Sequence, residues 1–147
     1  MASRSAVFEK FGQTAEVAQL FETDLGTILL ALEGEQRSWH LSPDPDSASA
    51  FYEKLNKKTL GQILTGVKSF VDLDDHVETI FQRALSARNR LNHGFFEGHN
   101  FAIYSPEGRD AMLADLEKLH TELFAAWQTS QRVSSFLVER LIDARST

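Results

Sequence analysis

The chain has 147 residues, of which 42% are hydrophobic, and it contains eleven phenylalanines and no cysteine. This length and composition predict a single globular domain over residues 1–147, and the lack of cysteine excludes disulfides and thiolate metal sites. A net charge of −6 argues against a protein that coats long nucleic-acid duplexes. The longest uncharged apolar run, Leu25 to Leu32, is too short to cross a bilayer, so we expect no membrane partner and a cytoplasmic location.

The first predicted helix runs from Ser3 to about Arg37. Its apolar residues recur at helical spacing, at Val17, Phe21, Leu25, Ile28 and Leu32. A straight helix of this length is unusual in so small a domain, so a bend or break is expected near Gly12 or Gly26. An irregular linker follows over about residues 40–47, because its prolines bias the residues before them away from helical dihedrals.

Three further helices are predicted in the middle of the chain. A short one covers about residues 48–56, and the next runs from its cap Thr59 to Phe70, with an inward face of Leu60, Ile63, Leu64 and Val67. The third begins after Asp72 or Asp74, whose carboxylates suit a helix cap better than a metal site. Gly94 is well placed to end it in a left-handed conformation.

An aromatic-rich loop from Phe95 to Tyr104 precedes the last predicted helix. Ser105 and Pro106 mark the start of that helix, which keeps helical spacing to the end through Met112, Leu116, Leu119, Leu123, Trp127, Leu137 and Leu141. The pattern therefore predicts an all-α antiparallel bundle of four to five helices. Helices this long carry apolar surface in excess of one small domain, so a symmetric homodimer is expected.

The segment from Arg88 to His93 is the most unusual part of the sequence. The apolar stripe of its helix comprises Val77, Ile80, Phe81, Ala84 and Leu85. Continued by steps of three and four, that stripe leads to Leu91 and otherwise to polar residues, namely Arg88, Asn89, Asn92 and His93. Polar groups on a core-facing stripe are costly unless a partner or ligand satisfies them, so chemistry is expected here.

Positive charge gathers around this motif. Between Arg83 and Arg109 there are four arginines and two acidic residues, although the chain as a whole is acidic. A small basic region on an acidic protein suits the binding of a local anion such as one phosphate group.

The string Arg88-Asn89-Arg90-Leu91-Asn92-His93 resembles the arginine–histidine signature of HEPN domains, including the polar residue that directly follows the arginine. The setting is similar too: the motif ends a helix in an all-α chain, Phe95 and Phe96 follow it, and a helix starting at Thr59-Leu60-Gly61 precedes it. This broader pattern is similar to that of small, largely uncharacterised bacterial HEPN-like proteins.

The resemblance implies a metal-independent endoribonuclease that needs no cofactor and acts on RNA at the interface of a homodimer. His93 would be the general acid or base, Arg88 would stabilise charge on the phosphate oxygens, and Asn89 would orient the imidazole or bind the phosphate. A toxin–antitoxin or phage-defence setting is implied as well, with an antitoxin or other protein partner. Control by modification of a tyrosine two places after the histidine is ruled out, since Phe95 stands there.

The chemistry agrees with these roles, because histidine titrates near neutrality and arginine is a permanent planar cation. Secondary RNA contacts are expected from residues around the motif, namely Arg90, Asn92, Phe95, Phe96 and His99. Two alternatives stay open. The polar residues at the helix end could satisfy its last carbonyls in a non-catalytic RNA-binding or protein-interaction module, and the loop aromatics could plug the bundle end instead of stacking on bases.

Overall fold

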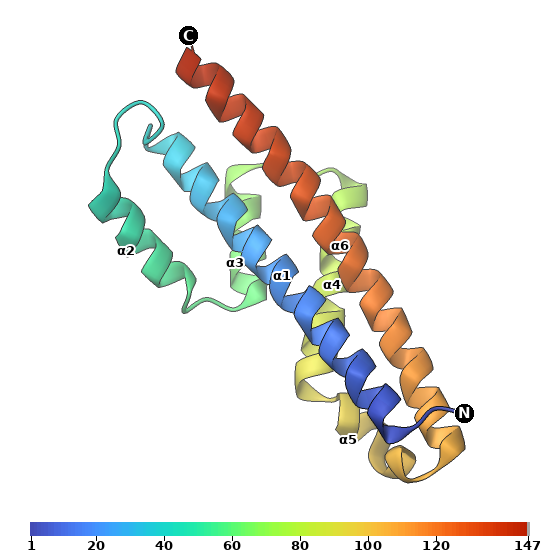
Figure 1. Ribbon diagram of the computed structural model, residues 1–147. Coiled ribbons are helices and arrows are strands. Elements are labelled where there is room, and N and C mark those ends of the chain that lie inside the picture. The colour runs from blue at the N-terminus through green and yellow to red at the C-terminus, as the bar shows by residue number, and fades with distance from the viewer. Residues whose placement is uncertain (147) are drawn as a thin grey trace. The chain divides into compact units, whose positions relative to one another are not determined.

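A computed structural model describes residues 1–146, and these residues are all-α, with 86% of the chain in helix and no strand in that range. Six α-helices and one 3₁₀ helix follow one another along them (Figure 1): α1 (Arg4–Gln36), α2 (Pro45–Leu55), α3 (Leu60–Phe70), α4 (Asp75–His93), α5 (Phe95–His99), η1 (Asn100–Tyr104) and α6 (Pro106–Ser146). The predicted all-α class is confirmed. α1 is not interrupted at Gly12 or Gly26. None of the helices in this range combines the length and the apolar character needed to cross a membrane.

The helix count is six, not four or five, because the segment Phe95–Tyr104 is not an open loop. Gly94 does not adopt the left-handed conformation expected of a helix terminator, since its φ is −163°. Its amide donates to the carbonyl of Arg90 at 3.1 Å, and its own carbonyl accepts from the amide of Gly98 at 2.8 Å. The chain therefore passes directly from α4 into α5, and η1 follows.

Local capping explains where α2 and α3 begin. α2 starts at Pro45, earlier than expected, because the Asp44 carboxylate accepts the amide of Ser47 at 3.2 Å and proline suits the first helical position. The linker between α1 and α2 therefore covers residues 37–44 and not about 40–47. Thr59 caps α3 as expected: its hydroxyl accepts the amide of Gln62 at 3.2 Å, while the Gln62 side chain accepts the Thr59 amide at 2.9 Å.

The chain forms two compact units, the first made of Met1–Phe21 and His76–Trp127, the second of Glu22–Asp75 and the residues from Gln128 onward. In the first unit α4 runs antiparallel to α1, because Phe81 packs against Phe21 at 5.4 Å between ring centroids and Phe95 packs against Phe11 at 5.8 Å. The core of this unit is built mainly from one face of each long helix, namely Val7, Val17, Phe21, Phe81, Ala84, Ala87, Leu91, Phe95, Met112, Leu116, Leu119 and Leu123.

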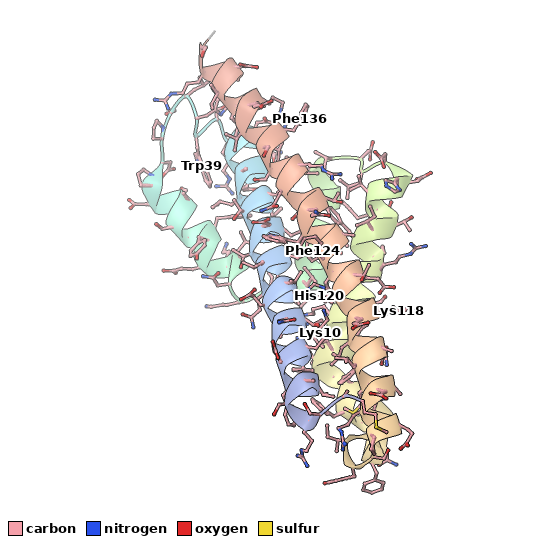
Figure 2. All side chains as sticks on the ribbon, turned by 45° about the vertical axis from the view of Figure 1, so that its right-hand side comes forward. Lys10, Trp39, Lys118, His120, Phe124 and Phe136 are labelled. Atoms are coloured by element: carbon pink, nitrogen blue, oxygen red, sulfur yellow. The ribbon has the colours of Figure 1, made fainter. Side chains whose placement is uncertain are left out.

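α1 and α6 run parallel to each other within the first unit. The Ala2 amide, just before α1, donates to the Asp110 carboxylate at 2.6 Å. Farther along both helices, the charge of Lys10 acts on His120. Figure 2 shows these last two residues on the same side of this unit, one on each helix.

The second unit also pairs α1 with α6 in parallel. The Ser130 hydroxyl donates to Asp24 at 3.2 Å, and Arg140 forms a two-point contact with Glu35 at 2.6 and 2.8 Å. Its buried hydrophobic residues include every inward position predicted for α3, and are Leu25, Ile28, Leu29, Leu32, Leu55, Leu60, Ile63, Leu64, Val67 and Leu137.

Candidate functional site

The motif Arg88–His93 forms the last turns of α4, in the first unit. The buried residues here are Ala87 and Leu91, each 2% exposed, while Arg88 is half buried. The exposed residues of the motif are Asn89, Arg90, Asn92 and His93. The expectation that the core-facing stripe turns polar is therefore wrong for all but Arg88. The stripe advances from Ala84 to Ala87 and Leu91, so it stays apolar and leaves the imidazole in solvent.

Arg88 and Asn89 contact each other. The Nη1 atom of Arg88 donates to Oδ1 of Asn89 at 3.4 Å, near the outer limit for a hydrogen bond. The Asn89 amide oxygen thus faces the guanidinium and not the imidazole of His93.

His93 lines a surface hollow of about 350 Å³. Its side chain is exposed, and within residues 1–146 it forms no hydrogen bond or ion pair. The hollow is walled by aromatic and polar side chains, including those of Phe11, Asn92, Phe95, Phe96 and Glu97. An imidazole in this position can exchange a proton with a group bound in the hollow.

Arg88 does not line this hollow. Residues five apart on a helix diverge by roughly 140°, which separates Arg88 from His93 on the surface of α4. One chain therefore presents the imidazole to the hollow and the guanidinium to a different side.

Arg90 and His99, expected as secondary RNA contacts, both bind the carboxylate of Asp115. Arg90 binds Asp115 of α6 through both Nη atoms, with Nη1 at 2.6 Å from Oδ1, and Nε2 of His99 lies 2.7 Å from Oδ2. The His99 ring also packs on Phe95 at 4.7 Å between centroids. Asp115 thus joins α4, α5 and α6, and both expected RNA ligands have a protein partner.

The charges of this cluster stabilise one another. The hydrogen bonds from Arg90, and to a smaller extent from His99, lower the pKa of Asp115 although burial acts to raise it. Asp115 in turn raises the pKa of Arg90. Asp115 was not among the predicted site residues. The feature of the sequence that could have indicated it is its position between two core residues of the same helix, Met112 and Leu116.

The aromatic residues after the motif divide into two groups. Phe95 is buried, 1% exposed, and acts as the plug that one interpretation predicted. Phe96 is exposed, and so are Phe101 and Tyr104 of η1. Phe96 also contacts Phe8 of α1, at 6.4 Å between ring centroids.

The region around the motif has less uncompensated positive charge than the sequence suggested. The Arg90 charge is compensated by Asp115, which lies outside the segment first considered. Arg109 donates from Nε to the carbonyl of Ala2 at 2.8 Å and from Nη1 to that of Ile103 at 3.1 Å, so it serves to hold the backbone.

No cluster of three or more histidine, aspartate or glutamate side chains that could hold a metal ion occurs in the described part of the chain. His120 of α6 stacks on Phe124 at 6.0 Å, and burial together with the nearby Lys10 lowers its pKa (Figure 2). The charge that acts on this imidazole is thus that of a cation.

No protein-family model matches the chain, and neither does any curated protein or any solved structure. The likeness to HEPN domains therefore rests on the residues of the motif and their helical setting.

Proposed function

We propose that the chain is a HEPN-like endoribonuclease of the cytoplasm that acts on RNA as a homodimer and without a metal ion. The observation that carries the proposal is the position of His93. This residue is exposed and lines a hollow, at the end of the helix that also carries the half-buried Arg88. The supporting pattern is the resemblance of this motif to the HEPN signature. The same resemblance suggests a toxin–antitoxin or phage-defence role with an antitoxin or other protein partner.

In the proposed reaction an imidazole removes the proton of a ribose 2′-hydroxyl. The 2′-oxygen forms a bond to the adjacent phosphorus and the bond from phosphorus to the 5′-oxygen breaks. That leaving oxygen takes up a proton from a water molecule, and the hydroxide left behind neutralises the imidazolium. The products are a 2′,3′-cyclic phosphate and a free 5′-hydroxyl.

Arg88 and His93 point in different directions on one helix, so we assign to a second copy of the chain the group that completes the site. If two motifs face each other, the guanidinium of one copy can approach the phosphate that the imidazole of the other copy serves. Asn89 holds the guanidinium through its amide oxygen, so we assign it a positioning role.

The test is cleavage of a mixed single-stranded RNA pool by the purified chain in the presence of a chelator, with analysis of the product ends. We expect His93→Ala and Arg88→Ala each to lower the rate by about a hundredfold or more. His76→Ala and Arg83→Ala are matched controls, because they remove exposed residues of the same type from the same helix. Intact RNA, or activity that requires a metal, would refute the proposal.

The half-burial of Arg88 and its contact with Asn89 favour a second candidate, a non-catalytic RNA-binding or interaction module in which Arg88 and His93 stabilise the dimer. In that case Arg88→Ala and His93→Ala would shift the monomer–dimer equilibrium, and RNA would remain intact with the unaltered chain. Light scattering on the same four variants separates the two candidates.

A further inference from the structure

A continuous row of exposed aromatic rings extends from the hollow at His93. We name it the aromatic strip. It consists of the rings of Phe96, Phe8, Tyr104 and Phe101 together with the guanidinium of Arg4. Phe96 lies 6.4 Å from Phe8, and Tyr104 lies 6.4 Å from Phe101, between ring centroids. The Arg4 guanidinium joins the two pairs, at 5.7 Å from the Phe8 ring and 5.8 Å from the Tyr104 ring.

The strip is assembled from α1, α5 and η1, and backbone contacts hold these elements together. Arg109 donates to the carbonyls of Ala2 and Ile103, which ties the start of α1 to η1. Gly108 allows η1 to approach α6, because a Cβ at this position would lie 2.1 Å from the carbonyl oxygen of Ala102. The rings are therefore presented on a preorganised surface.

The rings of the strip are unusually open to solvent. Phe101 is 73% and Tyr104 71% exposed, and Phe8 and Phe96 are each more than 40% exposed. Grouped exposed apolar side chains on a small protein mark a binding surface. A cation placed between ring faces suits a ligand that offers both flat apolar faces and negative charge.

We infer that the aromatic strip is a stacking platform that carries single-stranded RNA to His93, an inference that rests on the proposed function. Unpaired bases have free faces for stacking, whereas the bases of a duplex are already stacked on each other. Arg4 pairs with the backbone phosphates between stacked bases. Phe96 belongs both to the strip and to the wall of the hollow, so a strand that lies along the rings ends at the imidazole.

Binding is tested apart from cleavage by using the full chain with His93→Ala and a fluorescein-labelled oligouridylate of about twelve nucleotides. Fluorescence anisotropy gives the dissociation constant. We expect Tyr104→Ala and Phe101→Ala each to weaken binding by roughly tenfold, whereas Tyr104→Phe retains it because the ring remains. Phe136→Ala is the matched control, since it removes an aromatic ring that is 63% exposed in the other unit.

An oligodeoxythymidylate of the same length should bind about as well and remain uncut, because stacking does not read the 2′-hydroxyl while the reaction requires it. Unchanged binding in the two alanine variants would overturn the inference. So would a shift of these variants to a smaller assembly in light scattering with RNA affinity unaffected, since the strip would then join copies of the chain. Binding without any cleavage by the unaltered chain would refute the proposed function and leave the platform standing.

Discussion

Arg90 and Asp115, which are 25 residues apart, form a two-point ion pair between α4 and α6. The same carboxylate contacts His99 of α5 at 2.7 Å. One acidic side chain thereby holds the end of the helix that carries the motif and the helix that follows it. The wall of the hollow at His93 depends on both of these helices, so Asp115 acts on the candidate site through its position.

Asp115→Asn should lower the free energy of unfolding by about 1–2 kcal/mol. The lost interactions are charge-assisted hydrogen bonds, but Arg90 is 47% exposed and solvent screens part of their effect. Urea denaturation measures the change. Glu117→Gln is the control, because it alters an exposed acid on the same helix and should change stability by less than about 0.5 kcal/mol. Equal stability of the two variants would contradict the assigned role.

The contribution of Asp115 to the free energy of unfolding should become smaller as the pH falls. Arg90 lowers the pKa of Asp115 below its ordinary value of 3.8, so the unfolded chain takes up the proton first as the pH falls. The stabilisation is fully present above pH 3.8 and is lost as the pH falls through the lower pKa of the folded state. The stability difference between the natural chain and Asp115→Asn should therefore be constant near neutrality and shrink in acid, as followed by urea denaturation at several pH values. A difference that grows in acid would contradict this sign.

Two glycines in helices should respond in opposite ways to alanine. Gly108→Ala should cost about 1–3 kcal/mol, because the new Cβ would meet the Ala102 backbone and displace η1. Gly12→Ala should stabilise the chain by about 0.5–1 kcal/mol, since nothing lies within 4 Å of its Cβ position and alanine is the better helix former. Thermal unfolding of both variants gives the comparison, and a stable Gly108→Ala protein would show that η1 is not held where the structure places it.

Mixing two inactive variants should restore cleavage if the site is shared. When Arg88→Ala and His93→Ala chains exchange subunits freely, half of the dimers are mixed and each holds one intact site, which predicts about one quarter of full activity. The measurement is the initial rate of RNA cleavage after co-refolding. Each variant refolded alone is the control. No recovery would show that Arg88 and His93 act from the same chain.

Local patterns in the sequence predicted most of the helical structure. The reciprocal bonds of Thr59 and Gln62 begin α3, and the Ser105 hydroxyl accepts the Gly108 amide at 3.0 Å at the start of α6. These signals act within one helical turn, so no knowledge of the tertiary structure is needed to find them. The same holds for the apolar stripes of α1, α3 and α6, whose predicted positions are largely buried.

Local patterns in the sequence could not decide which residues of the motif are buried. Leu85 and Ala87 both border the stripe of α4, and only packing against the neighbouring helices shows that Ala87 is buried and Leu85 half buried. That choice rotates the stripe by a fraction of a turn, which moves His93 from the expected core into solvent.

Periodicity and capping, which depend on neighbours a few residues away, were thus enough to establish an all-α chain and the helix that carries Arg88 and His93. The partners of the site come from distant segments: Asp115 reaches Arg90 from α6, and Arg4 reaches Tyr104 from the start of α1. Contacts of this kind arise only when packing brings the helices together, because a residue's spacing along the chain carries no information about which other helix it will face.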